Sequence, residues 1–201
     1  MPRRSILLFA VLVLAIAMGV GAYALFAQRS GGAGGGGTPL NGGPFSLIDQ
    51  NRKRVTEKDF LGQYMLVFFG YTYCPDICPT ELQVMTAAID QMGPAGDRIT
   101  PVFISIDPER DTPEVLRAYV ENFGPRLVGL TGSAERIADV AKAYRVYYAK
   151  ASNSGPWDYL MDHSSIIYLM GPDGRYVKHF TYTADAPGLA RDLKAALTVS
   201  P

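Results

Sequence analysis

Cys74 and Cys78 are the only cysteines among the 201 residues, and both lie in the segment Y-T-Y-C-P-D-I-C-P-T-E-L. They fall between a buried apolar run and a predicted helix, whose N-terminal amides and dipole stabilise a thiolate. A spacing of four residues can bring both sulfur atoms to one side of a helical turn, where they bind a metal ion or form a disulfide. A purely structural disulfide is the less favoured interpretation, because so short a loop gives little entropic stabilisation.

A histidine supplies a candidate third ligand. The chain has two histidines, and His163 stands immediately before an apolar run that is typical of a buried strand. In an α/β sheet, we expect this position to lie at the same edge as the cysteine segment. His179 falls within a later strand and is interpreted as structural. Because thiolates select Cu(I) and imidazole also suits copper, Cys74, Cys78 and His163 are the candidate ligands.

Alternating strands and helices must position these residues. An uninterrupted apolar run at 65–71 and a second, mostly apolar segment at 101–106 predict buried strands, the first buried on both faces. Apolar residues three and four positions apart predict helices at 79–92, 112–123, 133–144 and 187–197. Shorter strands are predicted at 126–130, 165–170 and 175–180. With a hairpin at 45–55, this order indicates an α/β fold with a thioredoxin-like central sheet flanked by helices and an N-terminal β-hairpin.

The first residues of the chain predict a membrane anchor. Residues 6–27 form an uncharged run of 22 residues, about 33 Å long as a helix, which is enough to cross a hydrocarbon core of roughly 30 Å. Arg3 and Arg4 precede it, so the positive-inside bias leaves residues 1–5 in the cytoplasm. We therefore expect one transmembrane helix in a bacterial inner membrane and a domain in the periplasm. A cleaved signal peptide is the alternative, whereas so short a leader leaves no room for a mitochondrial transit peptide.

Composition separates a linker from a domain. Residues 28–44 hold eight of the 21 glycines, which predicts a flexible linker before a domain at 45–199. The chain has 19 basic and 19 acidic side chains, but three of the arginines precede residue 45, so the domain carries a net charge of −3. This charge excludes a generic nucleic-acid binder. A hydrophobic fraction of 48% argues against a disordered chain.

Three segments in order carry a resemblance to a known family. Y-T-Y-C-P-D-I-C-P-T-E-L, F-I-S-I-D-P-E-R-D-T-P and D-H-S-S-I-I-Y-L-M-G-P-D-G resemble the Sco/SenC family of membrane-anchored copper proteins, over roughly residues 45–197. The resemblance implies a thioredoxin-like fold and one copper ion bound through Cys74, Cys78 and His163. It also implies a part in assembling the binuclear copper site of cytochrome c oxidase, with the copper-bearing subunit as partner.

Residues near these motifs have further interpretations. Asp107 and Arg110 are expected to make loop ion pairs, and Asp111 or Thr112 to cap the next helix. Asp162 could orient the imidazole of His163. We expect packing to be the main role of Met161, although its thioether could reach copper. We expect Tyr71, Tyr73 and Asp76 to lie at the rim of the site. Trp157 and Tyr159 either form an aromatic surface for a partner or fill the small core of their own loop.

Two functions remain open. The first is a copper metallochaperone whose three ligands leave one side of the metal accessible to a partner's thiolates. The second is a thiol-disulfide oxidoreductase, with Cys74 as the attacking thiolate and Cys78 as the resolving thiol. Against the second, the spacing is C-x-x-x-C and not the C-x-x-C of redox thioredoxins. Other copper chaperones and thiol reductants are further candidate partners, and a peroxidase ranks third because no activated cysteine beside an arginine stands out.

Overall fold

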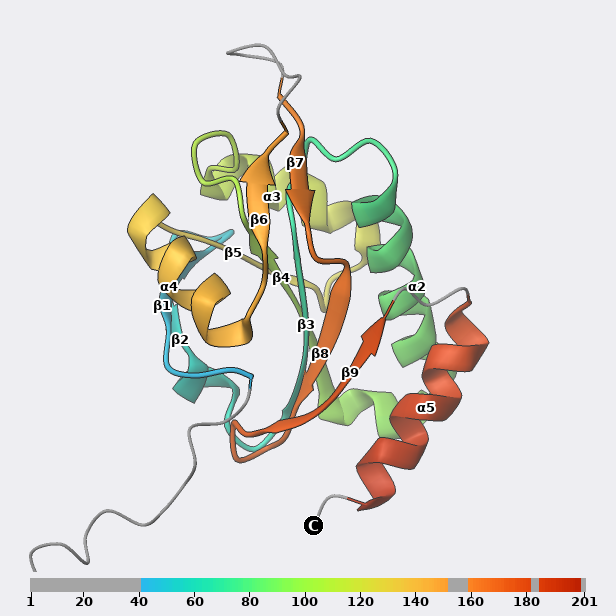
Figure 1. Ribbon diagram of the computed structural model, residues 1–201. Coiled ribbons are helices and arrows are strands. Elements are labelled where there is room, and N and C mark those ends of the chain that lie inside the picture. The colour runs from blue at the N-terminus through green and yellow to red at the C-terminus, as the bar shows by residue number, and fades with distance from the viewer. Residues whose placement is uncertain (1–40, 152–158, 182–184, 200–201) are drawn as a thin grey trace, which may run out of the picture. The chain divides into compact units, whose positions relative to one another are not determined.

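The computed structural model describes residues 41–151, 159–181 and 185–199 (Figure 1). The predicted anchor at 6–27 and most of the predicted linker lie outside these ranges, as does Trp157. Within the described ranges, none of the helices is both long enough and apolar enough to span a bilayer.

A seven-stranded mixed sheet in the order β2-β1-β5-β4-β3-β8-β9 forms the centre of the described domain (Figure 1). Its strands are β1 (Ser46–Asp49), β2 (Arg54–Thr56), β3 (Tyr64–Gly70), β4 (Ile99–Ser105), β5 (Val128–Thr131), β8 (Ile166–Met170) and β9 (Tyr176–Thr181). The apolar run of β3 is buried at all seven positions. It pairs in parallel with β4 on one side and antiparallel with β8 on the other, so the predicted fully buried strand is confirmed.

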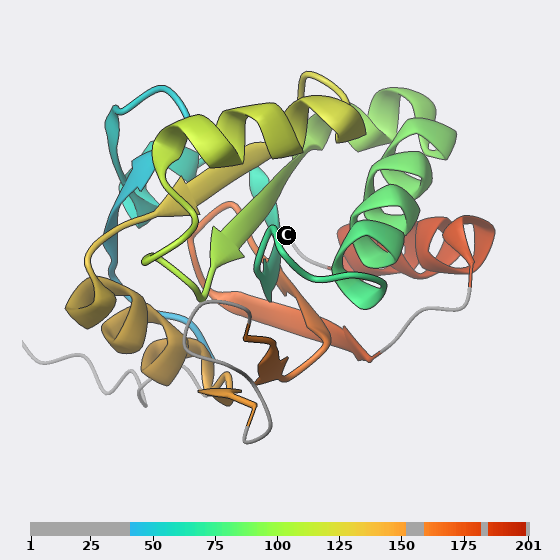
Figure 2. The ribbon, with the colours of Figure 1, turned by 90° about the horizontal axis from the view of Figure 1, so that it is seen from above.

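Helices cover both faces of this sheet, as expected (Figure 2). The α-helices are α2 (Ile77–Gln91), α3 (Pro113–Val120), α4 (Ala134–Tyr144) and α5 (Ala186–Val199), and short 3-10 turns are η1 (Glu57–Phe60), η2 (Gly93–Arg98) and η3 (Glu121–Phe123). Side-chain oxygens at the predicted caps accept backbone amides: Thr112 caps α3 and Ser133 caps α4. The predicted helix at 112–123 is correct in position. Only its first part, up to Val120, is an α-helix, and the rest is a 3-10 turn.

Two features near the candidate ligands were not predicted. Helix α2 begins at Ile77, two residues earlier than expected, which places Cys78 in its first turn. The chain before β8 forms a separate two-stranded ribbon, β6 (Tyr148–Lys150) with β7 (Met161–His163). Each of these strands has only three residues, which is too few for a recognisable alternation of apolar and polar positions.

The described chain enters the domain at the end of the sheet away from the cysteine segment (Figure 1). The amide of Gly42 donates to the carbonyl of Ala143, 2.9 Å away. A Cβ on Gly42 would lie 2.4 Å from the side chain of Met170, and its φ of +93° is one that glycine adopts readily. Since Met170 pairs with Met65 near the start of β3, residues 41–44 of the predicted linker lie against the domain at that end.

Candidate metal centre

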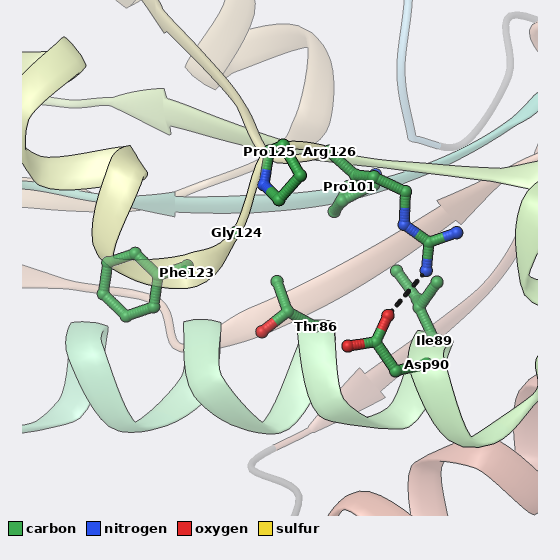
Figure 3. Close-up of a pocket in the computed structure, with 8 residues that line it drawn as sticks. All are labelled: Thr86, Ile89, Asp90, Pro101, Phe123, Gly124, Pro125 and Arg126. Carbon is green, nitrogen blue, oxygen red and sulfur yellow. Dashed lines mark hydrogen bonds and ion pairs between the residues drawn. The ribbon is translucent and has the colours of Figure 1, made fainter.

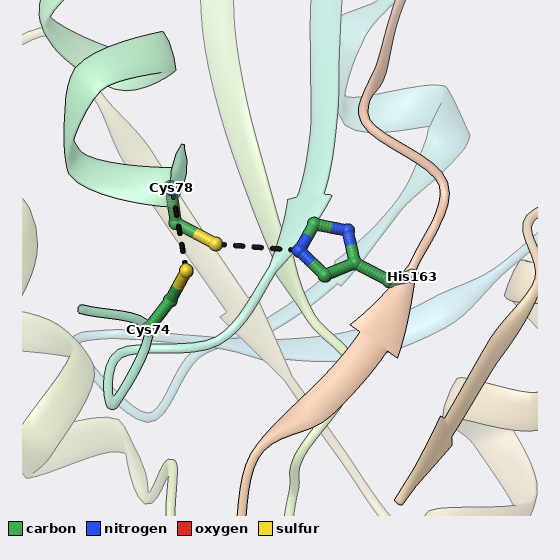
Figure 4. A group of neighbouring side chains, drawn as sticks. All are labelled: Cys74, Cys78 and His163. Carbon is green, nitrogen blue, oxygen red and sulfur yellow. Dashed lines mark hydrogen bonds between the residues drawn. The ribbon is translucent and has the colours of Figure 1, made fainter. Parts of the chain in front are cut away.

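The two cysteines occupy the junction between β3 and α2, but in different environments. Cys74 lies in the connecting loop and is partly exposed, whereas Cys78 in the first turn of α2 is fully buried. The backbone amide of Cys78 donates to the sulfur of Cys74, with N and Sγ 3.4 Å apart (Figure 4). This arrangement realises the predicted use of a helix N-terminus, because a free amide of the first turn faces a sulfur atom.

Gly70 makes room for the buried thiol, a role that was not predicted from the sequence. A Cβ at this position would lie 2.8 Å from the sulfur of Cys78 and 2.9 Å from the ring of Phe103. Only a residue without a side chain therefore lets the sulfur rest against the end of β3. A glycine that ends an otherwise bulky strand is the signal that could have indicated such a close approach.

His163 completes the cluster from the end of β7. Its Nε2 lies 3.5 Å from the sulfur of Cys78, and the ligand atoms of Cys74, Cys78 and His163 all lie within 4.8 Å of one another (Figure 4). The other ring nitrogen, Nδ1, lies 3.2 Å from the carbonyl oxygen of Ser164. A carbonyl only accepts, so Nδ1 carries the proton and Nε2 presents its lone pair to the sulfurs.

Aromatic rings hold the imidazole from two sides. Phe68 and Tyr71 each have their ring centroid 6.1 Å from that of His163, in edge-on geometry. Both rings are buried at the end of β3. They restrict the orientation of the imidazole, and they exclude water from its inner side.

The two thiols differ in acidity because they share a hydrogen bond. The Cys78 thiol lowers the pKa of Cys74 strongly, and His163 and the backbone amides add to that effect. The same hydrogen bond, followed by burial, raises the pKa of Cys78 well above its usual range. In the metal-free reduced pair, Cys74 is therefore the thiolate and Cys78 the protonated donor.

The D-P-E-R-D segment ties the cysteine loop to the rest of the domain. Asp111, one of the two candidate caps of α3, instead accepts hydrogen bonds from the backbone amide and the hydroxyl of Thr72, at 3.0 and 2.6 Å. Its carboxylate also accepts from the hydroxyl of Ser105 at 2.6 Å. Asp111 is fully buried, and burial raises its pKa. Thr72 lies two residues before Cys74, so these hydrogen bonds fix the backbone of the loop that carries Cys74.

The remaining candidates fall into place around this cluster. Asp162 is exposed and follows the alternation of β7, so it points away from the face of His163. The carbonyl of Ser164, and not the predicted carboxylate of Asp162, orients the imidazole of His163. Met161 is buried in the core, as expected for a packing residue. His179 hydrogen-bonds Tyr176 on β9, outside the three-residue cluster.

A small pocket elsewhere does not compete as a site for this chemistry. It lies between α2 and the segment after η3, has a volume of about 50 Å³, and contains none of the three ligand residues (Figure 3). Arg126 at its edge pairs with Asp90 at 2.9 Å and with Asp97 at 3.1 Å. These exposed ion pairs account for its charged groups.

The donor set defines the class of site. Two thiolate sulfurs are soft ligands that suit Cu(I), and an imidazole nitrogen also suits copper. The family model for SCO1/SenC matches residues 34–198. The chain belongs to the SCO1/SenC family.

Individual relatives agree with this assignment. Over 146 residues, 72% of this chain, it is 50% identical to the human protein SCO1 homolog, mitochondrial. It is 44% identical to Protein sco1 of Schizosaccharomyces pombe over 200 residues, covering 94% of this chain and 76% of that protein. The crystal structure of Arabidopsis thaliana ScoI with copper bound superposes with a TM-score of 0.76 at 46% identity, covering 80% of this chain and 100% of that one. The chain spans 48% of the human relative's length.

Proposed function

We propose that this chain is a copper metallochaperone that helps to assemble the binuclear copper site of cytochrome c oxidase. One copper ion would be its cargo, held by the sulfurs of Cys74 and Cys78 and by Nε2 of His163. The observation that carries the proposal is the convergence of these three donors within 4.8 Å, although 85 residues separate Cys78 from His163. The copper-bound Arabidopsis relative supports copper as the metal.

Each ligand has a separate task in this proposal. Cys74, already a thiolate and partly exposed, takes up the ion first and is the ligand that an incoming partner thiolate can reach. Cys78 must lose its proton when the ion arrives, because metal ligands bind in their deprotonated form. His163 offers Nε2 to the ion, because Nδ1 faces the carbonyl of Ser164.

Metal titration of the reduced domain tests the proposal. We expect one Cu(I) per chain, weaker binding in His163→Ala and no specific binding in the Cys74→Ser, Cys78→Ser double variant. His179→Ala is the matched control, because it removes the other histidine, which lies outside the cluster. Binding of full strength in the cysteine double variant would contradict the proposal, as would equal effects of the two histidine substitutions. Copper transfer is then tested by mixing the copper-loaded domain with the soluble fragment of the oxidase subunit that carries the binuclear copper site, prepared without its metal.

The different burial of the two cysteines also favours a second candidate, a thiol-disulfide reductase. Cys74 is the more accessible thiolate and Cys78 the buried thiol, as an attacking and a resolving residue require. The Cys74 thiolate would attack a disulfide of the partner, and Cys78 would then release the second partner thiol. The partner's disulfide is reduced to two thiols while the Cys74–Cys78 pair is oxidised to a disulfide.

The thiol state of the acceptor separates the two candidates. The oxidised copper-bearing fragment is incubated with reduced protein, and its free thiols are counted by alkylation and mass spectrometry. A reductase produces two acceptor thiols for each disulfide formed in this protein, with no copper present. An unchanged acceptor excludes the reductase and leaves the metallochaperone.

We further propose that residues 6–27 anchor the chain in a bacterial inner membrane, with residues 1–5 in the cytoplasm and the domain at 45–199 in the periplasm. The uncharged run and its preceding arginines support this topology. Carbonate-resistant membrane association together with protease sensitivity in spheroplasts is the expected result. A soluble product that starts near residue 28 would instead indicate a cleaved signal peptide.

A further inference from the structure

The three candidate ligands come from two segments of the chain that lie at one edge of the main sheet. Cys74 and Cys78 follow β3 directly, whereas His163 lies on the β6–β7 ribbon, which forms a sheet of its own. No pairing between this ribbon and the seven-stranded sheet occurs in the described part of the chain. The connection to β8, which pairs with β3, brings the end of the ribbon near the thiols. Side-chain contacts must then set the orientation of the ribbon itself.

Tyr159, four residues before His163, makes several of these contacts. Its side chain is buried, and its hydroxyl donates to the carboxylate of Asp107 at 2.7 Å. The guanidinium carbon of Arg110 lies 3.7 Å from the centre of its ring. Lys150, at the end of β6, lies 4.2 Å from the same ring and pairs with Glu109 at 2.8 Å. Strand β6 and the segment that leads into β7 are thus both attached to the loop that follows β4.

The same loop also contacts the cysteine segment. Arg110 lies over the rings of Tyr73 and Tyr71, at 4.8 and 5.7 Å from their centres. Its Nε pairs with Asp107, and its next neighbour, Asp111, holds the backbone of Thr72. One guanidinium therefore touches aromatic rings from both segments that carry the ligands.

The two terminal nitrogens of the Arg110 guanidinium are held by stacking against aromatic rings and not by hydrogen bonds. Its Nη1 and Nη2 are buried, and among the described residues neither has a hydrogen-bond acceptor. A planar, weakly hydrated guanidinium tolerates that position between aromatic faces, whereas the compact, strongly hydrated ammonium of lysine does not. Arginine is therefore required here for its shape as well as its charge.

We propose that Arg110, together with Tyr159 and Asp107, is a positioning residue for the copper site: it holds the ribbon so that His163 remains the third ligand. When this contact is lost, copper keeps its two thiolates and loses the imidazole. The inference rests on the proposed copper function, and it assigns to the D-P-E-R-D segment a role beyond its own loop ion pairs.

Arg110→Lys is the main test, and Arg98→Lys is its matched control. Arg98 also lies over a tyrosine, 5.4 Å from the ring of Tyr64, but Tyr64 begins β3, at the end opposite the ligands. We expect Arg110→Lys to weaken Cu(I) binding about tenfold in competition with a chromophoric chelator, as is typical for a residue that orients a metal ligand. Arg98→Lys should bind like the wild type. X-ray absorption of the loaded Arg110→Lys protein should show two sulfurs and fewer nitrogen neighbours.

A double-mutant cycle with His163→Ala separates positioning from a general structural role. If Arg110 acts through His163, Arg110→Lys causes no further loss of copper binding once His163 is alanine. Equal losses in both backgrounds, or no loss in either, overturn the inference while leaving the copper function intact. Failure of the wild type to bind copper would overturn the proposed function instead.

A metal-free measurement and a milder variant complete the test. The chain has only two histidines, so imidazole NMR signals of the reduced metal-free protein report on His163, with His179 as internal reference. We expect Arg110→Lys to shift or broaden the His163 signals alone. Tyr159→Phe keeps the stack but removes the hydrogen bond to Asp107, and it should give a smaller loss of copper affinity that also disappears with His163→Ala. Unchanged His163 signals in both variants would contradict the inference.

Discussion

The two cysteines are chemically identical side chains that the fold makes different. Cys74 in the loop and Cys78 in the first turn of α2 are close enough for the buried Cys78 thiol to donate to the partly exposed Cys74, so a single proton is shared unequally between them. Gly70 permits this, because any side chain there would occupy the space of the Cys78 sulfur. As a consequence, Cys74 is the reactive thiolate, whereas Cys78 remains a protonated thiol.

Alkylation rates should reveal this difference. A lowered pKa keeps Cys74 ionised as the pH falls, and its thiolate is lost only when the pH falls through that lowered pKa. Its reaction with iodoacetamide should therefore change little between pH 8 and pH 6, whereas an ordinary thiol, with a pKa of about 8.5, loses roughly tenfold per pH unit. Mass spectrometry after short pulses would locate the label on Cys74.

Cys78→Ala provides the control, because it removes the hydrogen bond that contributes most to the low pKa of Cys74. Reactivity at pH 6 should drop in this variant. Equal pH profiles for the variant and the wild type would show that the hydrogen bond does not set the acidity of Cys74.

At the scale of elements, three connections bring the ligands together: the β3–α2 junction, the loop after β4 and the β6–β7 ribbon. The first was predictable, because a buried apolar run followed by a helical spacing places Cys74 and Cys78 at a sheet edge. The position of His163 before β8 was predictable for the same reason. The ribbon and the contacts of Asp111 were not, since they depend on side chains that are distant in sequence and leave no periodic pattern.

The two neighbours Asp111 and Thr112 illustrate what sequence alone could decide. Both residue types cap helices, so the sequence left the cap of α3 open between them. In the structure Thr112 accepts the amide of Val115, and Asp111 turns inward to Thr72. Burial of a carboxylate is favoured here only because three donors converge on it, and no local pattern reports that convergence.

Substitution of these neighbours should separate stability from copper binding. Asp111→Ala leaves the amide of Thr72 and two hydroxyls without their acceptor, at a cost of about 1–3 kcal/mol in unfolding free energy, and it frees the cysteine loop. Thr112→Ala removes only the helix cap, at about 1 kcal/mol. Urea unfolding should show a loss in both variants, whereas a Cu(I) titration should show weaker binding in Asp111→Ala alone. Unimpaired copper binding by Asp111→Ala would mean that the loop is held without this network.

At the scale of the whole molecule, the proposed anchor, linker and domain have separable roles. The domain contains all three candidate ligands, so copper binding should not depend on the length of the glycine-rich segment. Delivery to a membrane-bound acceptor should depend on it, because its glycine content predicts a flexible chain, and the span of such a chain grows with the square root of its length.

Deletion of residues 31–37 tests this division. Copper binding by the purified protein should be unchanged, whereas oxidase assembly in cells, measured from the absorbance of its copper site, should fall. A same-length replacement of these residues by alternating glycine and serine is the control and should support normal assembly. If the deletion left assembly intact, reach would not limit delivery.

The packing of Gly42 beside Met170 fixes the end of the domain at which the chain enters. That end is near the start of β3, whereas the β3–α2 junction and β7, which carry the ligands, lie beyond the other end of β3 (Figure 1). Seven residues of strand, at about 3.3 Å each, separate the two by roughly 23 Å. The entry point of the chain and the three ligands are therefore at opposite ends of the domain, so residues 41–44 leave the ligand cluster open to an approaching acceptor.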